Sequence, residues 1–97
     1  MKTLQTINIS CIDNLIMESQ KILEQTHPVK IVVRTSDAEG KENNVTLYQK
    51  QKYVLLTPEN DEKRSLLYGN WEEALQATKR KIGLYQPETI TIDHYPI

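Results

Sequence analysis

The chain has 97 residues, of which 38% are hydrophobic and 26% charged, and its 12 Lys and Arg nearly balance its 13 Asp and Glu. This length is that of one domain with one modest core, so we expect a single domain over residues 1–97. The balanced charge excludes a bulk electrostatic attraction to nucleic acid or to anionic membranes, although a local patch remains compatible with it.

Cys11 is the only cysteine, so no internal disulfide can form, which fits a reducing compartment. The first five residues carry one positive charge but lead into no apolar segment of the kind found in signal peptides. No apolar run approaches the roughly 18 residues that suggest a membrane span. These features predict a soluble, cytoplasmic protein with no membrane partner.

Two elements are expected at the start of the chain. Residues 3–9 are a doubtful strand, because their alternation of apolar and polar side chains is weak. From Ser10 onward apolar residues recur at helical spacing, and Ser10 is a suitable cap. The pair His27-Pro28 ends this helix, because a residue before proline is pushed out of the α region. The stripe of this helix comprises Ile12, Leu15, Ile16, Ser19, Ile22 and Leu23.

A run of strands follows this first helix. Residues 29–35 are rich in β-branched side chains, and turn-forming residues at 36–40 separate them from a returning strand at 45–49. A second tight turn leads to a strand at 53–57, and residues 65–68 are one more short strand. Together these segments predict an antiparallel meander.

The clearest helix signal in the chain begins at Asn70. Its side chain can cap the first turn, and Glu73 can reach back to it. Gly83 suits a left-handed helix stop, and Pro87 follows shortly. Residues 89–93 alternate cleanly and predict the last strand. The apolar stripe of this helix comprises Trp71, Ala74, Leu75, Thr78 and Ile82.

Strands that alternate in polarity favour a sheet that is buried on one face and wet on the other. We therefore predict an α+β two-layer sandwich, in which an antiparallel sheet of four to five strands carries two helices on one face. If residues 3–9 form a strand, the element order approaches the βαββαβ ferredoxin-like plan with an inserted hairpin. If they do not, the order α-β-β-β-α is that of double-stranded-RNA-binding domains.

The passage Gly69-Asn70-Trp71-Glu72-Glu73-Ala74-Leu75 leads from a strand into a helix that a further strand follows. This passage resembles the same joint in small HicB-like antitoxin domains, and the likeness covers about a quarter of the chain. The resemblance implies the strand–helix–strand joint and no particular activity.

The wet face of the predicted sheet is the place where a binding surface can be argued. Aromatic rings among cations on an open sheet are typical of platforms for single-stranded nucleic acid, by stacking and phosphate attraction. A solvated sheet face with cross-strand side-chain pairs needs no ligand. The aromatic sequence signature of RRM domains does not accompany Tyr48. The candidate binding residues on this face are Lys30, Arg34, Tyr48, Lys50 and Lys52.

No constellation of side chains predicts chemistry. The two histidines, His27 and His94, have no metal-ligand spacing. Asp93 and His94 are adjacent, so on a strand they point to opposite faces and cannot form an acid–base pair. Cys11 lies beside the apolar stripe and is expected to be a buried thiol. The cations at 79–81 complement a helix C-terminus. We therefore expect no catalytic residues, no metal, no cofactor and no enzyme activity.

These expectations lead to a hypothesis of function. We predict a small non-enzymatic regulator or inhibitor that acts by protein–protein binding, through its wet sheet face or an edge strand. The candidate edge is the final strand, which also makes a homodimer conceivable. The alternative is a nucleic-acid-binding module that uses the cationic, Tyr-containing sheet face.

Overall fold

The computed structural model of the chain describes residues 5–25 and 28–96. The elements are, in chain order, β1 (Gln5–Ile9), α1 (Asn14–Gln25), β2 (Pro28–Ser36), β3 (Glu42–Lys50), β4 (Tyr53–Pro58), the short 3-10 helix η1 (Glu62–Arg64), β5 (Leu66–Tyr68), α2 (Trp71–Leu84) and β6 (Thr89–Pro96).

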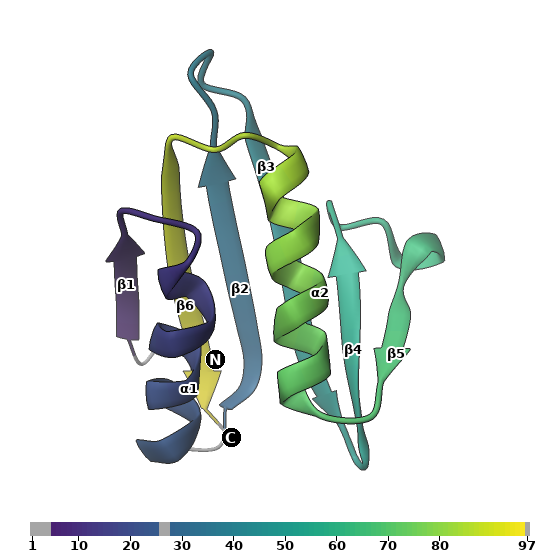
Figure 1. Cartoon of the computed structure of the whole chain (residues 1–97). Helices are drawn as coiled ribbons and strands as arrows, with labels where there is room; N and C mark the ends of the chain where they lie inside the picture. The colour runs from purple at the N-terminus through teal and green to yellow at the C-terminus, as the bar shows by residue number, and fades with distance from the viewer. Residues whose placement is uncertain (1–4, 26–27, 97) are drawn as a thin grey trace.

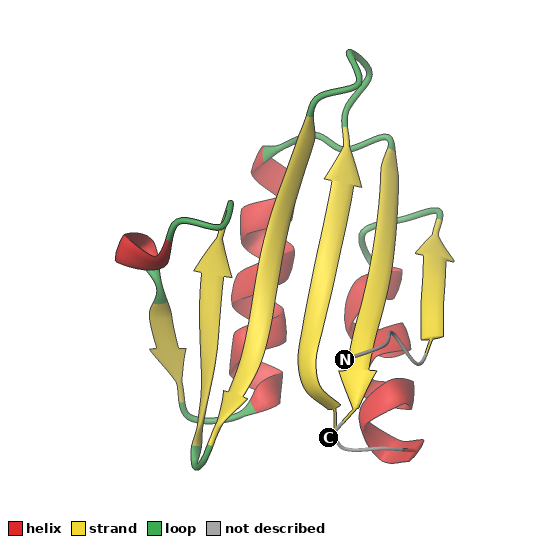
Figure 2. Cartoon of the chain, turned by 180° about the vertical axis from the view of Figure 1, so that it is seen from behind, coloured by secondary structure: helices red, strands yellow, loops and turns green. Residues whose placement is uncertain are grey.

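The strands form one antiparallel sheet in the order β1-β6-β2-β3-β4-β5. Both α-helices lie on the same face of this sheet, and the opposite face is uncovered (Figures 1 and 2). The predicted α+β arrangement of a sheet with two helices on one face is therefore confirmed. The sheet has six strands where four to five were predicted, because β1 and the three-residue β5 both pair with neighbours.

The core lies between the sheet and the two helices. Strands β2 and β3 direct every second side chain toward the helices, as the alternation predicts, because this burial removes apolar surface from water. The fully covered residues of the core comprise Leu15, Ile31, Val33, Val45, Leu47, Val54, Leu56, Ala74, Leu75, Ile82 and Ile92.

The first helix starts later than the sequence suggested. The chain turns after β1, with the Asn14 amide donating to the Cys11 carbonyl at 3.0 Å, and α1 begins at Asn14 instead of at a Ser10 cap. Because Cys11 lies in this turn, outside the helix, it is exposed, so the expectation of a buried thiol is wrong.

The second helix begins as predicted and ends differently. The Asn70 Oδ1 atom accepts a hydrogen bond from the Glu73 amide at 2.9 Å, which confirms the cap. Gly83 lies inside the helix, which continues to Leu84, and Gln86 takes the left-handed conformation with a φ of 51°. The helix runs past Gly83 because Tyr85 packs against the core, so the predicted glycine stop is wrong.

Strand β6 lies inside the sheet, between β1 and β2. The prediction of a free edge at the C-terminal strand is therefore wrong, and the edge strands are β1 and β5. His94 of β6 is buried on the helix side, whereas Asp93 lies on the uncovered face, so the prediction that these neighbours point to opposite faces is confirmed. None of the described helices is long and apolar enough to cross a bilayer.

Candidate binding face of the sheet

We call the sheet face opposite α1 and α2 the open face. The strand registers place one continuous row of side chains across it, from β6 to β5. Cross-strand neighbours in such a row lie close enough to touch, so the row behaves as one surface. It consists of Tyr95, Lys30, Tyr48, Leu55 and Leu67, and we call it the Tyr48 row.

Two lysines of the open face lie over tyrosine rings. The Lys30 Nζ atom is 4.5 Å from the ring centroid of Tyr95, and the Lys50 Nζ atom is 5.3 Å from that of Tyr48. Contacts of this kind contribute about 0.5–1 kcal/mol at exposed sites. The first contact joins β2 to β6, and the second lies within β3.

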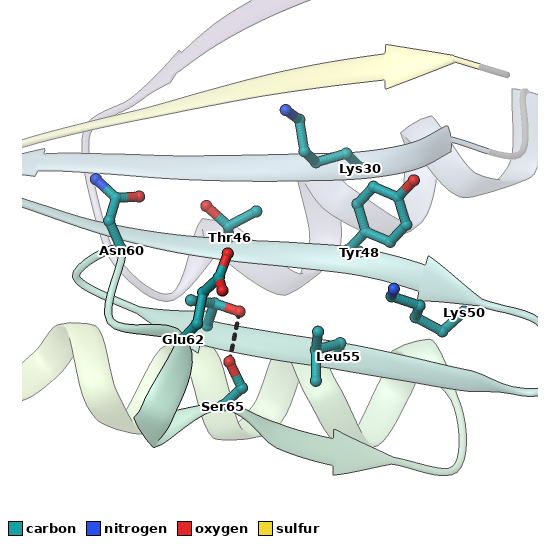
Figure 3. A pocket seen from close by; sticks show the side chains of 9 residues that line it. Lys30, Thr46, Tyr48, Lys50, Leu55, Asn60, Glu62 and Ser65 are labelled. Atoms are coloured by element: carbon teal, nitrogen blue, oxygen red, sulfur yellow. Dashed lines mark hydrogen bonds between the residues drawn. The ribbon is translucent and has the colours of Figure 1, made fainter.

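A shallow hollow of about 650 Å³ lies over the middle of the open face (Figure 3). Leu55 contributes apolar surface, and the hydroxyls of Thr57 and Ser65 hydrogen-bond to each other at 2.8 Å. Asn60 and Glu62 lie toward one end of the hollow, and Tyr48 and Lys50 toward the other (Figure 3). The hollow is lined by Lys30, Thr46, Tyr48, Lys50, Leu55, Thr57, Asn60, Glu62 and Ser65.

The turn that supplies Asn60 to the rim is strained. Glu59 and Asn60 have φ values of 54° and 59°, and the Asp61 amide donates to the Pro58 carbonyl at 2.8 Å. The left-handed conformation costs roughly 1–2 kcal/mol for a residue with a side chain. The Glu59 amide donates to the Asn44 carbonyl at 2.6 Å, which fastens this turn to β3.

The same turn is fastened to the end of α2. The Tyr85 hydroxyl donates to the Glu59 Oε1 atom at 2.7 Å, and the Arg64 Nη1 atom lies 3.5 Å from Glu59 Oε2. Burial and then this hydrogen bond raise the pKa of Tyr85 to about 12, and the bond lowers the pKa of Glu59. The contact of Tyr85 with Glu59 thus helps to hold the rim in place.

Arg34 is on the open face but is neutralised there. Its Nε atom donates to Asp93 Oδ2 at 2.7 Å and its Nη2 atom to Asp93 Oδ1 at 3.3 Å. Thr6 donates to the same carboxylate at 2.8 Å, and Asp93 is only 7% exposed. The hydrogen bond to Asp93 raises the pKa of Arg34. The charge of Arg34 is therefore largely offset inside the protein.

The five candidate binding residues thus fall into two groups. Lys30, Tyr48 and Lys50 line the hollow together. Arg34 pairs with Asp93, and Lys52 is exposed in the turn between β3 and β4, outside the hollow. The open face is thus less cationic than the five residues suggest from sequence alone.

Sequence reasoning missed the other side of the hollow. Leu55 and Thr57 follow from alternation along the strand at 53–57, once this strand is placed beside β3. Asn60, Glu62 and Ser65 come from the segment between β4 and β5, whose path no local pattern predicts.

The described residues include no group of three or more His, Cys, Asp or Glu that could hold a metal ion. The exposed Cys11 has its Sγ atom 3.6 Å from Asp13 Oδ2, while His94 is buried in the core. His27, the other histidine weighed for chemistry, lies outside the described residues. Of the cations at 79–81, Lys79 is bound to Asp13 at 3.2 Å.

No family model matches this chain, and no curated protein or solved structure gives a significant match to it. Function has to be inferred from the side chains of the open face.

Proposed function

We propose that the chain is a small non-enzymatic regulator or inhibitor that binds another protein on its open face and needs no cofactor. The observation that supports this proposal is a group of large apolar side chains on β3 and β4 of the open face, which no other described element covers. Tyr48 and Tyr53 are 39% and 53% exposed, and Leu55 lies between β3 and β5 in the Tyr48 row. Tyrosines with apolar neighbours are common anchors of protein interfaces.

The charges of the hollow favour a protein partner. Glu62 places a carboxylate beside the hollow that Lys30 and Lys50 also line, so a partner with both acidic and basic side chains finds complementary groups. A polyanion gains from the lysines but is repelled by Glu62, and the half-exposed guanidinium of Arg34 is already paired with Asp93.

A capture experiment tests this proposal. The tagged chain is incubated with native lysate, with and without nuclease, and bound proteins are identified by mass spectrometry. We expect a dominant protein that survives nuclease and is lost with Tyr48→Ala and with Lys30→Glu. The matched controls Leu84→Ala and Arg80→Glu change exposed positions on α2, in the other layer, and should leave capture intact. Equal loss with the control variants would contradict the proposal.

The second candidate function is single-stranded nucleic acid binding. It is favoured by one observation, that Lys30, Tyr48 and Lys50 line the same hollow. In this case the captured material disappears with nuclease, and affinity for a labelled oligonucleotide falls steeply with salt. Binding that is insensitive to salt and to Tyr48→Ala would remove this candidate.

A further inference from the structure

The strand β5 leaves its apolar side chains uncovered at the edge of the sheet. Leu66 and Leu67 are 55% and 62% exposed, although they point to opposite faces of the sheet. The strand Leu66–Tyr68 carries no charge and no proline, so of the usual protections of an edge it has only its length of three residues. No described strand pairs with β5 on its outer side (Figure 1).

The strand at the opposite edge of the sheet, β1, leaves less apolar surface uncovered than β5. On β1, Ile9 is buried under the helix layer and Ile7 packs against the core. Two polar side chains of β1 are bonded to β6, Thr6 to Asp93 and Asn8 to Thr91. The two edges therefore differ, and β5 is the one whose apolar surface a neighbour would cover.

We infer that a second copy of the chain pairs with β5, antiparallel and about a two-fold axis at Leu67. In this register Leu67 meets Leu67 of the copy on the open face, and Leu66 meets Tyr68 of the copy on the helix side. A two-fold interface presents the same patch twice, so the patch has to be self-complementary, and an uncharged strand centred on Leu67 meets this condition. The pairing covers the exposed leucines of both copies at once.

The position of Glu62 agrees with this pairing. Lys50 and Lys52 lie at the β3–β4 turn, beyond one end of β5, and Glu62 lies in η1, beyond the other (Figure 1). The two-fold axis turns the copy end for end, so Glu62 of each chain approaches the lysine-bearing turn of the other. Attraction over such distances weakens with salt.

The dimer is expected to be weak and to depend on concentration, because a three-residue strand gives a small interface. It joins two six-stranded sheets into one and makes the two open faces continuous. This goes beyond the proposed binding of another protein, and the two ideas can fail independently.

Sedimentation of the purified chain tests the dimer directly. As concentration rises into the millimolar range, the mean mass should rise from 11.3 kDa toward twice that value. Leu67→Lys places two like charges at the axis and should keep the chain monomeric, while the matched change Leu84→Lys, at an 82% exposed leucine of α2, should not. A chain that is monomeric throughout overturns the inference. So does a dimer that Leu67→Lys leaves intact.

A cross-linking experiment tests the register. In a Cys11→Ser background, Leu67→Cys places two thiols opposite each other at cross-strand distance, within the range that a disulfide accepts. Mild oxidation should give a covalent dimer with Leu67→Cys and none above background with Leu84→Cys. Equal cross-linking of both variants overturns the inference. A chain that stays monomeric but loses a captured partner with Leu67→Lys also overturns it, since the edge then takes a foreign strand.

Discussion

Arg34 and Asp93 form a two-point ion pair across β2 and β6, with the Arg34 Nε atom 2.7 Å from Asp93 Oδ2. The pair lies on the open face, yet the side chain of Asp93 is only 9% exposed, while that of Arg34 is half exposed. It joins the strand that sequence patterns predict best, β2, to the strand whose place in the sheet they do not reveal, β6.

Asp93→Asn should lower the free energy of unfolding by about 1–2 kcal/mol. Charge-assisted hydrogen bonds contribute more than neutral ones, but the exposure of Arg34 reduces the gain. Urea denaturation of Asp93→Asn, Arg34→Met and the double variant gives the coupling energy of the pair. A coupling energy near zero would show that the two side chains contribute separately.

His94 should make the stability depend on pH. It is 2% exposed, neither ring nitrogen has a hydrogen-bond partner among the described residues, and burial lowers its pKa below 6.5. Above pH 6.5 His94 is neutral in both the folded and the unfolded chain, so it does not make the free energy of unfolding depend on pH there. Below 6.5 the unfolded chain binds the proton first, and the free energy of unfolding falls by up to about 1.4 kcal/mol per pH unit.

The comparison of His94→Leu with the parent chain isolates this effect, since every other titrating group is common to both. The slope below 6.5 should be smaller in the variant. Ser19→Ala serves as a control, because the buried Ser19 hydroxyl also has no partner among the described residues but does not titrate. Ser19→Ala should raise the free energy of unfolding by about 1 kcal/mol at every pH. Identical pH profiles for His94→Leu and the parent would rule out the role of His94.

Tyr85 should ionise at an unusually high pH for a tyrosine. Its pKa is raised to about 12 from the usual 10.0, first by burial and then by the hydrogen bond to Glu59. Ultraviolet titration should show a late phenolate transition that disappears with Tyr85→Phe and moves to lower pH with Glu59→Gln. Tyr53→Phe, at an exposed tyrosine, should leave the late transition in place.

Gly83→Ala should raise the free energy of unfolding by about 0.5–1 kcal/mol, because glycine inside a helix is less favourable than alanine. The added Cβ atom would lie 3.7 Å from the Ile12 Cδ1 atom, an ordinary contact. Gln86→Gly should also stabilise, by about 1 kcal/mol, because Gln86 holds the left-handed conformation. Chemical denaturation measures both. A loss of stability with Gly83→Ala would instead indicate a left-handed glycine.

Local patterns predicted the elements well where a single segment contains the whole signal. The Asn70 cap and the alternation of Ile31 and Val33 are examples, because helix capping and strand periodicity depend on neighbours in the chain. The predicted cap at Ser10 was wrong because a local turn from Cys11 to Asn14 precedes the helix, and the predicted stop at Gly83 was wrong because a tertiary contact lies beyond it. Tyr85, held by Glu59, carries the last turn of α2 past Gly83.

The candidate site was predicted only in part for a related reason. Lys30, Tyr48 and Lys50 share the hollow because β2 and β3 are consecutive strands, so their register follows from a short connection. The neutralisation of Arg34 needs Asp93, which lies 59 residues away, and Glu62 reaches the hollow only through the path of a loop. Sequence spacing contains no information about either contact.

The position of β6 in the sheet also determines the order in which the strands can pair during synthesis. Strand β1 has no other neighbour among the described strands, and the bond from Thr6 to Asp93 joins residues 87 apart. During synthesis, residues 28–84 can form the β2–β5 meander and α2 before β6, the only partner of β1 among the described strands, has left the ribosome. Closing such long loops is slow. A chain halted before residue 89 would therefore leave an open side at β2, exposed to the wrong strand.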